Sequence, residues 1–188
     1  MRRLGRPDPP PPLAASHVPA VIRLNAPSGH RLPRTLIERA VRTTLQQEGV
    51  SAAEISVTFL SDGPIRDLNL RWLGHDWVPD VLSFRLHDPS EPSVGDIYVG
   101  FEQAARQAAE DGIPLEEELC RLAIHGALHV LGHDHAPHGA SAATDRTNDE
   151  AMYARQEMLL GLALAEGGAD APRLRGRGRE SPTKRRKA

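Results

Sequence analysis

The segment that most constrains this chain is the histidine-rich stretch at residues 125–135, which reads HGALHVLGHDH. Two histidines four positions apart on a helix, here His125 and His129, project from one face with Cβ atoms about 6 Å apart. Both imidazole rings can then reach one metal ion at about 2.0–2.1 Å. Gly132 can adopt the left-handed conformation that ends a helix, so that the chain can bring His135 back to the same ion. The stretch therefore predicts a metal site formed by His125, His129 and His135.

The number of ligands indicates what kind of metal site this is. Three nitrogen ligands with a fourth position for water are typical of catalytic zinc, whereas structural zinc usually has four protein ligands. The alternative is a set of ordinary core histidines. Five of the nine histidines lie between His125 and His138, and burying unpartnered imidazoles in the apolar segment 119–131 would be costly. We therefore predict one bound Zn²⁺ ion.

The residue after the first histidine limits which hydrolytic reaction the metal site is expected to catalyse. The spacing is that of the metzincin metalloproteases, H-E-x-x-H-x-x-G-x-x-H. In that motif the glutamate is the general base that activates the zinc-bound water. Gly126 occupies its position here, which leaves a zincin-type metalloprotease as an alternative only. Zinc alone can lower the pKa of a bound water to about 7, so hydrolysis of a phosphodiester is a candidate reaction.

Three segments, in the same order, resemble the YbeY family of bacterial endoribonucleases. Residues 125–135 resemble its H-G-x-L-H-L-x-G-[YH]-D-H motif, residues 68–69 with 80–84 resemble L-N … D-V-L-S-F, and residues 95–97 resemble G-D-I. The resemblance covers residues 20–166 approximately. It implies a metal-dependent, single-strand-specific endoribonuclease that acts in the 3′-end maturation of small-subunit ribosomal RNA and in ribosome quality control. Its partners would be ribosomal RNA and the small ribosomal subunit, in the cytoplasm. A non-catalytic assembly factor with a structural metal is a further alternative.

The candidates for contact with the substrate phosphate are arginines. Many family members carry an arginine before a glycine upstream of D-V-L-S-F, and this chain has Leu73 before Gly74. Arg71 is the nearest arginine in sequence, and a guanidinium suits phosphate through bidentate hydrogen bonds. We therefore name Arg71 as a catalytic candidate, although positions 71 and 73 of a helix point about 200° apart. Arg85 or His75 would take this role if Arg71 does not.

The acidic candidates have structural alternatives. Asp134 stands between two histidines and can orient a ligand ring, cap the turn or act as a general base. Asp80 and Asp96 lie at predicted strands, and for each of them a structural role in bonding loop amides and a catalytic role both remain open.

The charge distribution divides the chain into three parts. Residues 18–166 carry 12 Lys/Arg and 22 Asp/Glu, a net charge of −10, whereas residues 167–188 carry +6 and residues 1–17 carry +2. We expect one domain over 18–166, a disordered Pro/Arg-rich segment over 1–17 and a disordered basic tail over 167–188. The tail is either simply solvated or a nonspecific tether for RNA.

Composition sets further limits. Two Trp, two Tyr and three Phe argue against a stacking platform for single strands, which needs several exposed rings. The single Cys excludes an intrachain disulfide and fits a reducing cytosol. No run of about 18 apolar residues exists, so no membrane span is expected.

The pattern of apolar residues predicts an α+β fold with a small mixed sheet of about four strands, about five helices and the zinc-binding helix at the centre. The expected strands are residues 18–25, 54–60, 81–86 and 96–101. The expected helices are residues 32–47, 61–73, 103–110, 115–131 and 149–166. Thr147 and Glu150 predict a capping box at the start of the last helix.

Overall fold

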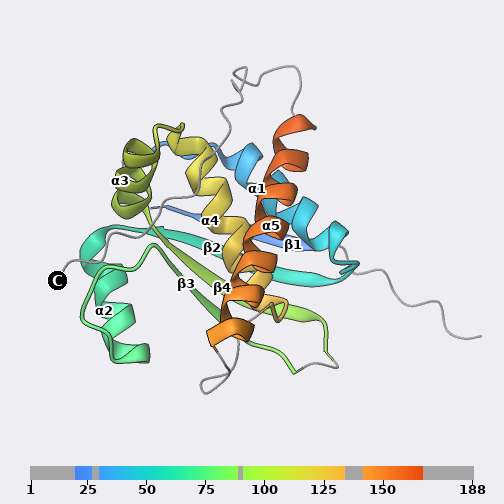
Figure 1. Ribbon diagram of the computed structural model, residues 1–188, viewed down its shortest axis with the longest axis horizontal. Helices are drawn as coiled ribbons and strands as arrows, with labels where there is room; N and C mark the ends of the chain where they lie inside the picture. The colour runs from blue at the N-terminus through green and yellow to red at the C-terminus, as the bar shows by residue number, and fades with distance from the viewer. Residues whose placement is uncertain (1–19, 27–29, 89–90, 134–141, 167–188) are drawn as a thin grey trace, which may run out of the picture.

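The structure, a computed structural model, describes residues 20–26, 30–88, 91–133 and 142–166 (Figure 1). The strands are β1 (Val21–Asn25), β2 (Ala53–Leu60), β3 (Val81–Arg85) and β4 (Ser93–Gly100). The helices are α1 (Arg34–Gln47), α2 (Asp62–Leu73), α3 (Phe101–Asp111), α4 (Leu115–Val130) and α5 (Ala142–Ala165). The predicted α+β class is confirmed, with four strands and five helices in the described part of the chain.

The sheet is mixed, with the strand order β1-β2-β4-β3. β1, β2 and β4 run parallel, and β3 pairs antiparallel with β4 at the edge. Ser83 lies opposite Ile97 and Phe84 opposite Asp96 in this pairing. Because side chains alternate between the two faces of a strand, Ser83 shares the face of the core residue Ile97. Phe84 and Asp96 lie on the other face.

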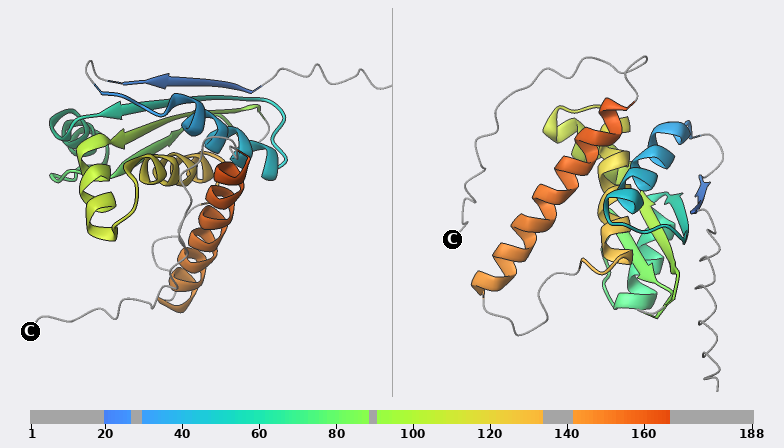
Figure 2. Two further views of the ribbon diagram at one scale, coloured as in Figure 1. Left: turned by 90° about the horizontal axis from the view of Figure 1, so that it is seen from above. Right: turned by 90° about the vertical axis from the view of Figure 1, so that its right-hand side faces the viewer.

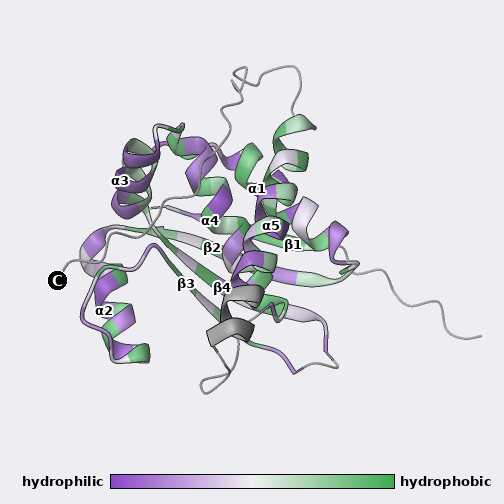
Figure 3. Cartoon of the chain, in the orientation of Figure 1, coloured by the Kyte–Doolittle hydropathy of each residue, from purple (hydrophilic) through white to green (hydrophobic). Residues whose placement is uncertain are grey.

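The core lies between one face of this sheet and the helices. β2 shows the period of two that the sequence predicts, with Ile55, Val57 and Phe59 fully buried. α4 packs on β3 and β4, and α5 packs on α1 and α4 (Figure 2). Along α2 and α3, hydrophobic positions are interspersed with hydrophilic ones (Figure 3). α4, which carries His125 and His129, contacts α1, α3, α5, β3 and β4 and is therefore central, as predicted.

The turn that ends α4 has a Schellman geometry. The Gly132 amide donates to the carbonyl of His129 at 3.0 Å, and the His133 amide donates to the carbonyl of Leu128 at 3.0 Å. Gly132 has a φ of 99°, which favours glycine because it has no Cβ. The predicted helix end at Gly132 is thus confirmed, one turn after the second histidine.

One part of the sequence prediction is wrong, and another concerns residues that the structure does not describe. α5 begins at Ala142, so positions 147 and 150 lie inside the helix and the predicted capping box is wrong. Ala142 and Ala143 precede the predicted capping box. Because alanine has the highest helix propensity, these two residues favour a helix that begins before Thr147. The segments 1–17 and 167–188, predicted to be disordered, lie outside the described residues. No described helix is long and apolar enough to cross a membrane.

Candidate active site

Two histidines from successive turns of α4 converge on one point. The Nε2 atoms of His125 and His129 are 3.1 Å apart, and the two rings meet at 75°. Two nitrogen ligands of a tetrahedral zinc ion, each at 2.0–2.1 Å from it, lie about 3.3 Å from one another. The two rings therefore fit one zinc-sized ion. No three His, Cys, Asp or Glu side chains of the described residues form a ligand set, so a third protein ligand would come from outside them, where His135 lies.

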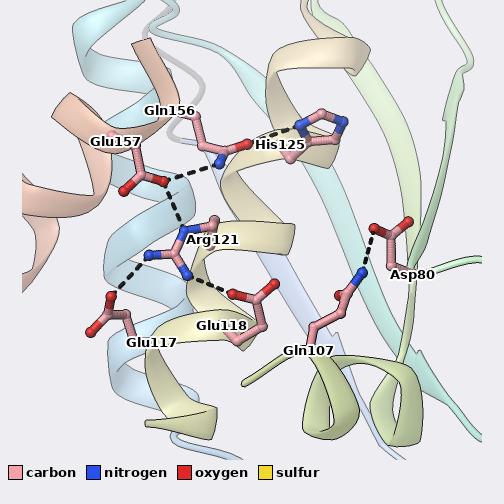
Figure 4. Close-up of polar contacts among 8 residues, drawn as sticks. All are labelled: Asp80, Gln107, Glu117, Glu118, Arg121, His125, Gln156 and Glu157. Atoms are coloured by element: carbon pink, nitrogen blue, oxygen red, sulfur yellow. Dashed lines mark hydrogen bonds and ion pairs between the residues drawn. The ribbon is translucent and has the colours of Figure 1, made fainter. Parts of the chain in front are cut away.

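A buried glutamine fixes the state of the first histidine (Figure 4). Nδ1 of His125 donates to Oε1 of Gln156 on α5, at 2.9 Å. Nε2 of Gln156 lies 3.3 Å from the carboxylate of Glu157, to which it donates, so the amide oxygen is the atom that faces His125. Because this oxygen only accepts, the hydrogen of His125 is on Nδ1 and the lone pair is on Nε2. A hydrogen bond to the ring nitrogen that does not bind the metal holds a metal-binding histidine in the right tautomer and orientation.

A buried ion-pair cluster anchors this glutamine. Arg121, one turn before His125, donates to Glu157 at 2.8 Å, to Glu118 at 2.5 Å and to Glu117 at 2.9 Å. Burial raises the pKa of Glu118, and the hydrogen bond from Arg121 opposes that rise. The cluster joins α4 to α5 directly beneath the candidate metal ligand (Figure 4).

Replacing Gln156 by leucine is expected to weaken zinc binding by about tenfold or more. Removing the hydrogen bond that supports a metal-binding side chain typically lowers the affinity of the site for its metal by about 10–100-fold. Gln156→Glu keeps an acceptor at the same place and should retain the affinity. Competition with a chromophoric chelator measures both. Equal affinity in the leucine variant would show that the contact does not position His125.

Two cavities flank His125. One, of about 490 Å³, is lined by both histidines, by Asp80 and by Arg85 at the end of β3. The other, of about 280 Å³, lies between α4 and α5 and also touches His125 and Asp80. Arg85 supplies the positive charge of the first cavity, as far as the described residues show. Its Nε donates to the carbonyl of Val130 at 3.1 Å, so Arg85 also binds carbonyls at the C-terminus of α4, where basic residues are favourable.

Gly126 faces the sheet, not the cavity. A Cβ atom there would lie 2.5 Å from Cγ2 of Ile97 and 3.0 Å from Oγ of Ser83. The glycine therefore lets α4 approach β4 and β3 closely, and a glutamate at this position has no room to act as a base. The position that suggested a missing peptidase base is a packing position in this fold.

Gly126→Ala should accordingly lower the free energy of unfolding by about 1–3 kcal/mol, the usual cost of overpacking a core. Urea denaturation measures this change. Gly161→Ala in α5 is a matched control, since a Cβ there meets no atom within 4 Å. If Gly126→Ala were as stable as this control, the close approach of α4 to the sheet would be contradicted.

The predicted phosphate contacts lie in different places. Arg71 is exposed on α2, with its guanidinium carbon 5.6 Å from the ring centroid of Trp72, and α2 continues past it to Leu73. Leu73 lines the larger cavity, but Arg71 does not. His75 stacks on Trp77. The structure thus brings Arg85, the fallback candidate, to the histidines; the catalytic role of Arg71 stays a prediction.

The acidic candidates and the other histidines of the 125–135 segment lie in different places. The carboxylate of Asp80 accepts from the amide of Val81 at 2.7 Å and from Gln107 at 3.2 Å, and Asp80 also lines both cavities. Asp96 lies on the sheet face opposite to α4, away from the cavities. His133 bonds Glu48, the residue that follows α1, through Nε2 at 2.8 Å. Asp134 and His135 lie outside the described residues, so their roles stay predictions.

Fold and site together define a small α+β protein with a His-x-x-x-His helix between two cavities. The sequence profile of the family described as "Endoribonuclease YbeY" matches residues 28–160. Curated relatives named Endoribonuclease YbeY include one from Anaeromyxobacter sp. (strain Fw109-5), 40% identical with 78% of this chain and 77% of the relative covered. Another, from Moorella thermoacetica, is 40% identical, with 71% of this chain and 88% of the relative covered. The chain therefore belongs to the endoribonuclease YbeY family.

A solved structure supports the fold alone. The solution structure of TM1509 from Thermotoga maritima matches with a TM-score of 0.54 and 24% identity, covering 79% of this chain and 93% of that one.

Proposed function

We propose that this chain is a metal-dependent endoribonuclease that cuts single-stranded RNA, with one zinc ion held by His125, His129 and His135. The observation that carries the proposal is the convergence of two Nε2 atoms 3.1 Å apart, with the tautomer of His125 set by Gln156. Family membership supports the same reaction class.

The residues of the chain suit this reaction. Bound zinc would supply Lewis acidity, which stabilises charge that develops on a phosphoryl oxygen. Gln156 keeps Nε2 of His125 unprotonated for coordination. Arg85 brings positive charge to the histidine-lined cavity, and a guanidinium is well suited to phosphate oxygens. Asp80 lines the same cavity and in this proposal would accept a proton from a group that approaches the histidines.

Cleavage assays with two substrates separate this proposal from the metalloprotease alternative. The purified chain is incubated with single-stranded RNA and with casein, each with and without a chelator. We expect chelator-sensitive cleavage of RNA and no comparable cleavage of casein, because the position of the metzincin general base is occupied by Gly126, which packs against Ile97 and Ser83. Chelator-sensitive proteolysis at a comparable rate would refute the proposal.

We further propose that the RNA is the 3′ end of small-subunit ribosomal RNA, processed in the cytoplasm on the small ribosomal subunit and as part of ribosome quality control. The support is the family resemblance, and no observation favours a non-catalytic assembly factor. Cells that lack this chain should accumulate small-subunit RNA with an unprocessed 3′ end, which end mapping would detect. Restoration by wild type but not by His129→Ala would tie the defect to the metal site.

The basic segment 167–188 is proposed to raise RNA affinity without contributing to the fold. Its charge of +6 adjoins a body of −10, and phosphate contacts make binding salt-dependent. Deleting it should leave the melting temperature almost unchanged and flatten the dependence of RNA binding on salt. A large fall in melting temperature would show instead that the tail packs on the body.

A further inference from the structure

A cluster of exposed apolar side chains lies at the end of α2 and in the loop that follows it. Nine large apolar side chains of the described residues are exposed, and four of them lie within eight positions: Leu70, Trp72, Leu73 and Trp77. Trp72 is 61% exposed and Trp77 57%, and these are the only two tryptophans in the chain. Together with His75 we call these residues the tryptophan patch. Concentrations of this kind mark interaction sites.

The rings of the patch are held in place. His75 and Trp77 stack with centroids 4.2 Å apart and planes at 16°. Trp72 meets Phe84 of β3 edge to face, at 6.1 Å between centroids. The buried Asn69 donates to the carbonyl of Trp77 at 3.0 Å. A surface that is already ordered loses less conformational freedom when it binds a partner.

A second hydrogen-bonded contact also anchors the loop. Arg66 of α2 donates through Nε to Asp76 at 2.7 Å, and Gly74 ends α2 with a φ of 74°. The loop between α2 and β3 is therefore tied back to the helix that precedes it.

The tryptophan patch adjoins the candidate active site and carries a cation. Leu73 belongs to the patch and also lines the cavity that contains His125 and His129. The guanidinium of Arg71 lies over the ring of Trp72. No carboxylate of the described residues pairs with Arg71. Flat exposed rings beside an available cation match the bases and the phosphates of a nucleic acid strand.

We propose that the tryptophan patch binds single-stranded RNA beside the histidine-lined cavity, with bases stacked on Trp72 and Trp77 and a phosphate near Arg71. This inference rests on the proposed function, since it takes RNA as the substrate. It reverses the expectation drawn from the low aromatic content: the aromatic residues are few, but two of the largest stand exposed at the rim of the site. A protein partner would also fit an apolar surface, but it would not require the arginine over the ring.

The two tryptophans make the test direct, because all intrinsic tryptophan fluorescence comes from the patch. The probe is a single-stranded dodecanucleotide RNA with 2′-O-methyl groups, checked for integrity after each titration, with the corresponding duplex as comparison. We expect quenching by the single strand and little by the duplex, whose bases are already stacked. Trp72→Leu and Trp77→Leu should each weaken binding by about tenfold, within the range for loss of one stacked base. Trp72→Phe should recover most of that loss.

Leu162→Ala, at an exposed position of α5, is the control and should bind like wild type. If the single strand causes no quenching and the leucine variants bind RNA as wild type does, the inference is overturned, and a protein partner is then the better reading of the patch. Cleavage of RNA by the wild type, measured in parallel, keeps the two proposals apart. A chain that cleaves RNA without quenching contradicts the tryptophan patch alone, whereas a chain that neither binds nor cleaves RNA contradicts the proposed function.

Discussion

His129→Ala is expected to lose stoichiometric zinc and to cleave single-stranded RNA at least about a thousandfold more slowly, which corresponds to about 4 kcal/mol in the barrier. The substitution removes one of the two Nε2 atoms that converge at 3.1 Å. It leaves the partly buried contact between His125 and Gln156 in place, so the fold should persist. Elemental analysis of the purified variant and a single-turnover cleavage assay measure the two losses.

His133→Ala is the matched control for this experiment. His133 is only four positions from His129 on the chain, but its ring bonds Glu48, which directly follows α1. The variant should keep its zinc. Full metal content in His129→Ala together with loss in His133→Ala would show that the ligands are assigned wrongly.

Arg121→Met should destabilise the protein by about 3–5 kcal/mol at neutral pH, the usual cost of removing one partner from a buried ion pair. The side chain of Arg121 is 11% exposed, and that of Glu118 is 7% exposed. Methionine fills similar volume but leaves the carboxylates of Glu117, Glu118 and Glu157 without their shared cation. Arg42→Met, in an exposed pair with Glu38, should change the free energy of unfolding by about 0.5 kcal/mol or less.

The loss of folding stability in Arg121→Met should depend on pH. Burial raises the pKa of Glu118 already in the wild type, and removal of the opposing cation raises it further. A carboxyl group whose pKa is higher in the folded state binds its proton more tightly there. It therefore destabilises the fold above that pKa, and the penalty fades as the pH falls through it. Urea denaturation from neutral to mildly acidic pH should show the gap to wild type narrowing. A gap that widens on acidification would contradict this account.

Local patterns in the sequence were enough to predict much of this architecture. The period of two in β2 predicted a strand with one buried face, and the apolar run of α4 predicted a long buried helix. The spacing of His125 and His129 predicted that their rings share one side of α4, because helix geometry alone fixes that relation. Gly132 predicted the end of the helix for a similarly local reason.

Contacts that depend on tertiary packing could not be predicted in this way. Gln156 is 31 positions from His125, and only the packing of α5 on α4 brings them together. A glutamine in a helix carries no local signal of such a role. The packing role of Gly126 likewise depends on a distant residue, Ile97 of β4. The contact between Trp72 and Phe84 depends on where α2 meets β3.

The central claim is that one metal ion at the paired histidines enables RNA cleavage. The most direct measurement is the zinc content of the purified full chain together with its cleavage of single-stranded RNA, before chelation, after chelation and after zinc is restored. We expect one ion per chain, loss of cleavage on chelation and its return with zinc. Undiminished cleavage by protein shown to be free of metal would contradict the account.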